Sequence, residues 1–193
     1  LGIDCSAFVY SSLASAGLRV KKNLSLQAAL VYGMSSAMFA DPGANGLSCL
    51  APVTMNKNLW LQSGDIVALP GHVFMIDQVG SDPFGLQGIL SKSQCTPQLI
   101  RVANFDFSVI QSSPSKGGVG INRILAKDYL ETSDKFREAF VDFAVRTCKA
   151  KFGEKPGLAK GIATITRHLG TPECFDREIA LAGESCLRNC PLP

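Results

Sequence analysis

Two apolar stretches near the middle of the chain, residues 65–69 and 72–79, are separated by a Pro-Gly pair. This pair favours a tight turn, and the stretches on either side have the length and composition of strands. The pattern therefore predicts a strand, a turn and a second strand. His72 is the first residue of the second strand, so the sheet would hold its imidazole in a fixed position.

Three further stretches carry strand patterns, at residues 99–104, 107–112 and 119–124. Residues 107–112 alternate apolar and polar side chains, as a half-buried strand does, and Gln111 lies at the end of this stretch. Residues 80–97 interrupt the series and are interpreted as an excursion from the sheet. Together these patterns predict a small, mostly antiparallel sheet.

The segment from Cys5 to Ala16 has a helical pattern, because its apolar residues recur on one face of a helix. Asp4 precedes it, where a carboxylate can accept hydrogen bonds from free backbone N–H groups and act as an N-cap. Ser6 is expected to cap or pack the same turn, and Gly17 follows at the position of a C-terminal cap. The sequence thus predicts a short helix that begins at a cysteine.

Helical spacing returns in the last third of the chain, in a stripe formed by Phe136, Phe140, Phe143 and Thr147. Such a stripe is typical of a helix that packs on a sheet. Weaker patterns predict other helices at residues 25–39, 158–169 and 176–187. We therefore predict an α+β fold: an antiparallel sheet with the cysteine helix in residues 1–126, then a disulfide-linked helical extension in residues 127–193.

The composition excludes several classes of protein. A hydrophobic fraction of 46% with 18% charged residues argues against disorder, and 193 residues suffice for one substantial core. No apolar run approaches the length of a membrane span. The net charge is +3, but the basic residues are scattered along the chain, so no nucleic-acid partner is expected. No membrane span is expected either. We expect a monomer without metal or cofactor, cut from a longer precursor because the cysteine motif starts at residue 4.

Seven cysteines in a chain of this length are many for a reducing compartment. If Cys5 is set aside, an even number remains: Cys49, Cys95, Cys148, Cys174, Cys186 and Cys190. We expect Cys49 to pair with Cys95 and the C-terminal four to pair among themselves. Zinc bound by those four is the alternative, but they lack the Cys-x-x-Cys pairs of common zinc ribbons. Disulfides, and a periplasmic or secreted location, are therefore favoured.

Cys5 is the candidate nucleophile because of its place at the start of a helix. Backbone N–H groups and the helix dipole stabilise a thiolate there, and the same groups can later hold an oxyanion. A buried core cysteine or a disulfide partner is the alternative. His72 is the candidate base and Gln111 a group that could orient it. His168, the other histidine, is expected near a helix C-terminus, where it would complement the dipole.

Several short segments resemble, in order and residue type, the NlpC/P60 family of cysteine peptidases: Asp4-Cys5-Ser6-Ala7-Phe8-Val9, Ser63-Gly64-Asp65-Ile66-Val67, Gly71-His72-Val73, Val109-Ile110-Gln111-Ser112-Ser113 and Gly118-Val119. The resemblance covers roughly residues 1–124. It implies a papain-like α+β core, and hydrolysis of amide bonds in bacterial cell-wall peptides, often between D-glutamate and a diamino acid.

By position, the resemblance implies that Cys5 is the nucleophile, His72 the base and Gln111 the third polar residue, where the family most often has histidine. Asn104 and Asp106 are alternatives for the third residue, because the stretch after His72 is longer than usual in the family. Asp4, Ser6 and Gly71 flank these groups and are the expected substrate-binding residues. Ala7 stands where the family commonly has glycine.

The expected function is a thiol hydrolase that cleaves peptidoglycan stem peptides through an acyl-enzyme. The same groups would serve an amidase or acyltransferase acting on another acyl substrate, and the same fold without turnover would serve as a cell-wall-binding module. A reactive Cys5 would be alkylated rapidly at mildly acidic pH, whereas a buried or disulfide-bonded one would not. Paired acids for glycoside cleavage are not expected on core elements.

Overall fold

The computed structural model describes residues 4–22, 33–57, 60–114 and 118–176. Its centre is a six-stranded sheet with strand order β1-β6-β2-β3-β4-β5, and every pairing between neighbours is antiparallel. The strands are β1 (Leu50–Pro52), β2 (Ile66–Leu69), β3 (His72–Val79), β4 (Phe107–Ser112), β5 (Ile121–Leu125) and β6 (Thr164–His168). The predicted α+β class is confirmed.

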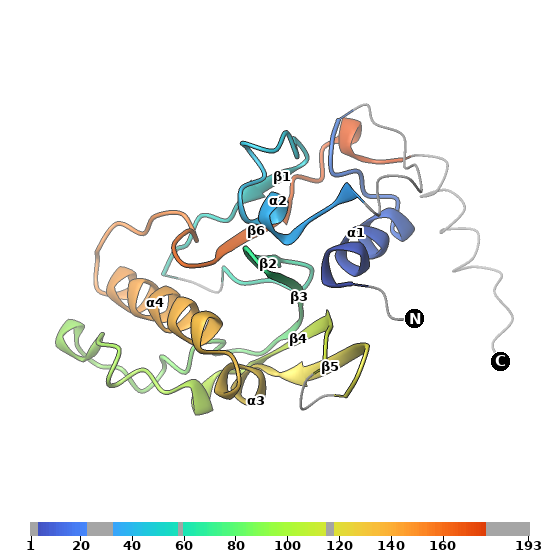
Figure 1. Ribbon diagram of the computed structural model, residues 1–193. Helices are drawn as coiled ribbons and strands as arrows, with labels where there is room; N and C mark the ends of the chain where they lie inside the picture. The colour runs from blue at the N-terminus through green and yellow to red at the C-terminus, as the bar shows by residue number, and fades with distance from the viewer. Residues whose placement is uncertain (1–3, 23–32, 58–59, 115–117, 177–193) are drawn as a thin grey trace, which may run out of the picture.

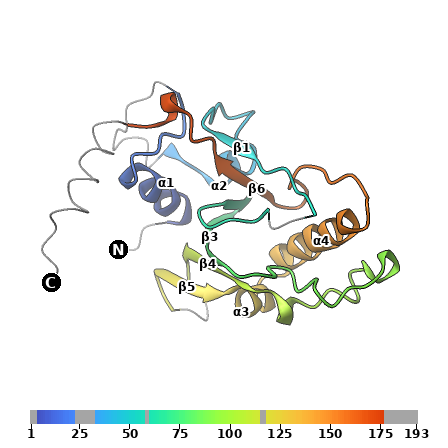
Figure 2. The same cartoon turned by 180° about the vertical axis from the view of Figure 1, so that it is seen from behind.

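Helices cover both faces of this sheet (Figure 1). One face carries α1 (Cys5–Ser15) and α2 (Ser36–Ala40), and the other carries α3 (Ala126–Glu131) and α4 (Asp134–Lys151). The view from behind shows the same three layers (Figure 2). Short 3-10 turns occur at Lys92–Gln94, Val102–Asn104 and Pro172–Cys174. No helix within the described ranges is long and apolar enough to cross a membrane.

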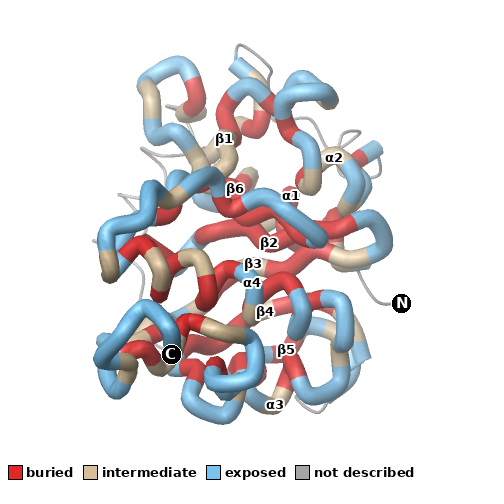
Figure 3. The backbone as a smooth tube through the Cα atoms, turned by 90° about the vertical axis from the view of Figure 1, so that its left-hand side faces the viewer, coloured by how far each residue is buried: buried red, intermediate tan, exposed pale blue. Residues whose placement is uncertain are grey.

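The alternation of side chains along β2 and β3 gives each helical layer its own core. Val67 and Phe74 belong to the cluster under α3 and α4, while Ile66 and Val73 belong to the cluster under α1 and α2. Because both faces are covered, β2 is buried along its whole length and β4 along most of it, while β3 is buried at Val73, Phe74 and Ile76 (Figure 3). Both helical layers are therefore held on one rigid sheet.

Local predictions around the hairpin and the first helix are confirmed. Leu69 pairs with His72 across the Pro-Gly turn, so β2 and β3 form the predicted hairpin. Gly71 has a φ of 108°, a conformation that glycine adopts without a Cβ clash. Asp4 caps α1 as predicted, by accepting a hydrogen bond from the Ala7 N–H at 2.7 Å.

The aromatic stripe of α4 packs on the sheet as predicted. The helix buries the whole stripe, which consists of Phe136, Phe140, Phe143 and Thr147. The Trp60 indole N–H donates a hydrogen bond to Thr147 Oγ1 at 2.9 Å, so the polar residue of the stripe is satisfied inside the core.

The predicted helix at residues 158–169 is wrong, because Thr164–His168 forms β6. β-branched residues favour strands, and Ile165 and Thr166 are fully buried between the two helical layers. Arg167 also fastens β6 to the start of β2 through two contacts with Asp65, Nε to Oδ1 at 2.7 Å and Nη2 to Oδ2 at 2.8 Å. The chain after residue 126 thus completes the sheet, while the proposed domain division at that residue stays a prediction.

The predicted strand at residues 99–104 is also wrong, since Val102–Asn104 is a 3-10 turn. Both edges of β4 are occupied by β3 and β5, which leaves this segment no edge of β4 to pair with. Ile100 packs into the core instead. Residues 25–32 and 177–187, which carry most of two other predicted helices, lie outside the described residues.

The predicted disulfide pairing is wrong. Cys49 is bonded to Cys174 and Cys95 to Cys148. The cause is β6, which returns the chain beside β1, so that Leu169 N–H donates to Cys49 O at 2.9 Å and Cys174 follows close by. Zinc binding by the C-terminal cysteines loses two of its ligands to these disulfides. The other two, at positions 186 and 190, lie outside the described residues.

Candidate Cys-His site

The first turn of α1 is fixed by its own side chains. Asp4 Oδ1 accepts hydrogen bonds from the Ala7 N–H and, at 2.9 Å, from the Ser6 hydroxyl. The same hydroxyl lies 2.9 Å from the Met34 carbonyl oxygen. The hydrogen bond from Ala7 lowers the pKa of Asp4, against a smaller opposing effect of burial. Asp4 and Ser6 therefore position the turn, and their expected contacts with substrate stay a prediction.

Cys5 begins α1 and is the free cysteine of the described residues, with a half-buried side chain. Burial works against ionisation of the thiol. Hydrogen bonding with His72 and with the Val73 backbone N–H, together with the attraction of the imidazolium charge, outweighs it, so the pKa of Cys5 lies below its usual range. Thus the helix start predicted from the sequence carries a thiol that ionises easily.

His72 stands at the start of β3, directly after the hairpin turn. Burial of the ring favours the neutral imidazole. Hydrogen bonds with Cys5 and Gln111 favour the imidazolium more strongly, so the pKa of His72 is raised. The lowered thiol pKa and the raised imidazole pKa both favour a thiolate-imidazolium pair.

Gln111 holds the other side of the imidazole. Its Oε1 lies 2.8 Å from His72 Nε2, and its side chain is fully buried on β4. Its amide nitrogen donates to Asn122 Oδ1 at 3.4 Å, and Asn122 Nδ2 donates to the carbonyls of Ser113 at 2.7 Å and Gly120 at 2.9 Å. This chain of donors aims the Gln111 oxygen at His72, so Nε2 carries the hydrogen and Nδ1 is the nitrogen left for the thiol.

The structure brings Cys5, His72 and Gln111 together and leaves the alternatives apart from them. Asn104 and Asp106 precede β4, whereas Gln111 lies near its other end. The Asp106 backbone is engaged there, since its carbonyl accepts a hydrogen bond from Gly80 N–H at 2.8 Å. Gly71, expected to contact substrate, lies in the hairpin turn, where its N–H donates to Ser36 Oγ at 2.9 Å.

Two aromatic residues beside His72 were missed by the sequence analysis. The centroid of its ring lies 6.5 Å from that of Tyr129 and 6.0 Å from that of Phe136, with the latter ring edge-on. Burial raises the pKa of the Tyr129 hydroxyl, which hydrogen-bonds the Ser133 side chain. The predicted stripe began at Phe136, but nothing in its spacing indicated that the stripe reaches the histidine. The α3 and α4 region therefore supplies one wall of the site.

A pocket of about 430 Å³ opens along this wall. It is lined by residues of the hairpin, the end of β4 and the connection between α3 and α4: Leu69, His72, Ser113, Pro114, Tyr129, Thr132, Ser133, Asp134, Lys135 and Phe136. Its volume is in the range of cavities that hold a small ligand or an amino-acid residue. The structure therefore has an open cavity beside His72.

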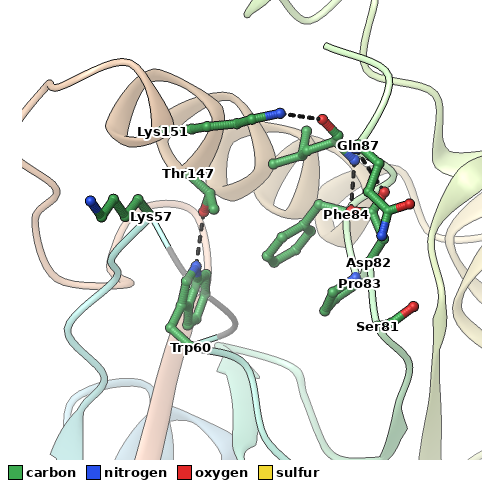
Figure 4. Close-up of a pocket in the computed structure, with 10 residues that line it drawn as sticks. Lys57, Trp60, Ser81, Asp82, Pro83, Phe84, Gln87, Thr147 and Lys151 are labelled. Carbon is green, nitrogen blue, oxygen red and sulfur yellow. Dashed lines mark hydrogen bonds between the residues drawn. The ribbon is translucent and has the colours of Figure 1, made fainter. Parts of the chain in front are cut away.

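A second pocket, of about 490 Å³, lies around Trp60 and Phe84 (Figure 4). The carboxylate of Asp82 accepts hydrogen bonds from the Leu86 N–H at 2.7 Å and the Gln87 N–H at 2.8 Å. In the close-up, Lys151 reaches across toward the same loop and donates to the Leu86 carbonyl at 3.0 Å. Neither cysteine nor histidine occurs among its described lining residues, and these charged groups hold the loop in place.

His168 is placed differently from the prediction, since it ends strand β6 rather than a helix. Its Nδ1 accepts a hydrogen bond from Gly170 N–H at 3.1 Å, so Nε2 donates to the Arg19 carbonyl at 3.0 Å. Ligand atoms of His168, Cys49 and Cys174 lie within 4.8 Å of one another, an arrangement that could hold a metal ion. Both sulfurs are joined in a disulfide, however, and offer no thiolate.

No protein-family model, curated protein or solved structure matches this chain. The geometry of the site and the motifs in the sequence are therefore the observations that bear on function.

Proposed function

We propose that the protein is a cysteine hydrolase of the NlpC/P60 type, with a papain-like core, that cleaves an amide bond in peptidoglycan stem peptides. The observation that carries this proposal is the arrangement at Cys5. This residue has a free thiol at the start of a helix and interacts with His72. The Nε2 atom of His72 is in turn hydrogen-bonded to the buried side chain of Gln111. A nucleophile, a base and an orienting group in this order are what nucleophilic catalysis requires.

Acylation uses the thiolate and the imidazolium together. The Cys5 sulfur attacks the carbonyl carbon of the amide, so a C–S bond forms and the carbonyl oxygen becomes an oxyanion. His72 then gives its proton to the leaving nitrogen, the C–N bond breaks, and an amine departs from a thioester on Cys5. The positive end of α1, including the Cys5 N–H, is the proposed stabiliser of the oxyanion.

Deacylation reverses the proton transfer. Neutral His72 takes a proton from a water molecule, whose oxygen attacks the thioester carbonyl. The C–S bond breaks, a carboxylic acid leaves, and the thiolate and imidazolium are restored. Gln111 keeps Nε2 protonated in both half-reactions, so that Nδ1 always faces the sulfur and the substrate. No metal or cofactor is needed for this cycle.

The choice of substrate is supported by the motif resemblance and by the disulfides. Two disulfides are consistent with a periplasmic or secreted protein, because such bonds persist in oxidising compartments. The stem peptides of bacterial peptidoglycan lie outside the reducing cytoplasm, where such a protein would meet them. The D-glutamate to diamino acid bond is the specific linkage that we propose.

Purified peptidoglycan should be incubated with the parent protein and with a Cys5→Ala variant that has the circular dichroism of the parent. New stem-peptide fragments, identified by mass spectrometry in the parent sample alone, are the expected result, and their masses identify the bond. Equal fragment patterns with and without the protein would contradict a cell-wall peptidase, and would direct the search to other acyl substrates or to a binding module.

A further inference from the structure

The pocket of about 430 Å³ has His72 among its lining residues. In the proposed reaction the imidazolium delivers its proton to the departing nitrogen, so that nitrogen has to be within hydrogen-bond reach of the ring. The group attached to it then extends away from Cys5, along the surface next to His72. The pocket formed by the α3 to α4 connection is the cavity found there.

Most polar groups of this pocket are already engaged. Thr132 Oγ1 donates to the Tyr129 carbonyl at 2.9 Å, and the Tyr129 hydroxyl bonds the Ser133 side chain. Asp134 forms an ion pair with Arg137, with Nη2 2.6 Å from Oδ1. These groups are occupied by neighbours on the same two helices.

Lys135 differs from them, because it makes no hydrogen bond or ion pair with any residue of the described ranges. Lys135 is exposed and is a lining residue of the same pocket as His72. The charge of a His72 imidazolium is balanced by the Cys5 thiolate, and the one carboxylate on the described lining is paired with Arg137, so Lys135 is the lining cation left without a counter-charge. An anionic group entering the pocket therefore meets a net attractive field.

We propose that this pocket binds the leaving part of the substrate and that Lys135 is a specificity-determining residue, which favours a carboxylate on the amine that is released. This inference depends on the proposed hydrolase function and adds to it a binding surface outside the segments that carry the motif resemblance. Lys135 would act by charge attraction, which is weak at an exposed position and is screened by salt.

The test uses two synthetic tripeptides, L-Ala-γ-D-Glu-L-Lys with its terminal carboxylate free or converted to the amide. The parent protein is expected to hydrolyse the free acid with a kcat/KM up to about fivefold higher, the upper end of the effect of one exposed charge pair. Lys135→Gln should remove this preference and Lys135→Glu should reverse it. Lys127→Gln, which removes an exposed lysine of α3 outside the pocket, should leave it unchanged.

Binding of the same peptides to the Cys5→Ala variant, measured by calorimetry, gives a readout that does not need turnover. A preference for the acid that disappears when Lys135→Gln is added supports recognition of the carboxylate by Lys135; if the parent cleaved neither peptide, the proposed hydrolysis would fail while this recognition would stand. Equal kcat/KM values for both peptides, or equal affinities in the binding experiment, would overturn the role of Lys135 and leave Cys5-dependent hydrolysis standing.

Discussion

The two histidines of this protein each lie beside cysteine sulfur, but the two clusters are chemically different. His72 faces Cys5, a free and half-buried thiol at the start of a helix. His168 lies beside Cys49 and Cys174, which are fully buried and joined to each other. A histidine next to sulfur is therefore not sufficient for chemistry. The state of the sulfur decides which cluster can contain a nucleophile.

The partners of each imidazole add a second difference. His72 bonds a side-chain amide that is itself oriented by Asn122, and its other nitrogen is left for the thiol. His168 has both nitrogens bonded to backbone groups, the Arg19 carbonyl and the Gly170 N–H. One ring has a nitrogen available for proton transfer, while the other is used to join β6 to the segment after α1.

The largest expected effect is on catalysis. Cys5→Ala or His72→Ala should each lower kcat/KM by about a thousandfold or more, because the nucleophile and its base act as one unit. His168→Ala should leave kcat/KM unchanged in a sample shown to be folded. Steady-state kinetics on a defined stem peptide measures kcat/KM for all three variants. A large loss in the His168 variant alone would show that the cluster around His168, and not the one around His72, is the active site.

The next effect is on stability and concerns the other cluster. Replacing both Cys49 and Cys174 by alanine should lower the free energy of unfolding by about 2–5 kcal/mol, because their bond closes a long loop in the unfolded chain. Urea unfolding measures this change. Activity per folded molecule should remain near that of the parent at low temperature, and a loss comparable to that of Cys5→Ala would show that this cluster has a direct role.

Gln111 should have an intermediate effect on catalysis. Gln111→Leu replaces the amide by a shorter apolar side chain and so removes the hydrogen bond to an imidazolium, which should lower kcat/KM by about 10- to 100-fold. Gln111→Glu, which retains an acceptor oxygen, should recover part of the loss. Asn104→Ala is the matched control at the other end of β4. If that control lost as much activity as Gln111→Leu, the third member of the site would be misassigned.

The smallest effect is a shift in the pH profile. kcat/KM should rise as Cys5 ionises, at a pH below the usual thiol value of 9.0, and fall as His72 loses its proton, at a pH above the usual value of 6.5. In Gln111→Leu the basic limb should move to lower pH, because a hydrogen bond that raises the His72 pKa is gone. A basic limb that stays in place would show that Gln111 does not stabilise the imidazolium.

The pKa shifts of His72 and Cys5 also make the free energy of unfolding depend on pH. The raised His72 pKa contributes stability that is complete below the unfolded value near 6.5 and is lost as pH rises through the folded value. The lowered Cys5 pKa contributes above the unfolded value near 9.0, and this part is lost as pH falls through the folded value. Cys5→Ala should remove the Cys5 dependence and weaken that of His72, where the hydrogen bond to Gln111 remains, and urea unfolding at several pH values can measure both changes.

The parts of the molecule that follow from local sequence were predicted well. The Asp4 cap, the Pro-Gly hairpin whose second strand begins with His72, and the α4 stripe each depend on neighbours in the chain, and the structure contains all three. The contact between Gln111 and His72 was expected from strand patterns and motif order. The structure shows the hydrogen bond, while its catalytic role stays a prediction.

The parts that failed depend on contacts between distant segments. β6 was assigned to a helix because a strand inserted between β1 and β2 is defined by its neighbours more than by its own pattern. The disulfide prediction failed for the same reason, since Cys49 and Cys174 meet only after β6 has paired. The wall of Tyr129 and Phe136 beside His72 likewise depends on how α3 and α4 lie on the sheet.

Alkylation of the native protein tests the contrast between the two clusters most directly. A short pulse of iodoacetamide at about pH 6, followed by peptide mapping with mass spectrometry, reports every reactive thiolate in one experiment. We expect rapid modification of Cys5, at a rate that falls strongly in His72→Ala, and none at Cys49 or Cys174. An unmodified Cys5, or a rate that does not depend on His72, would contradict the proposal that this pair forms the active site.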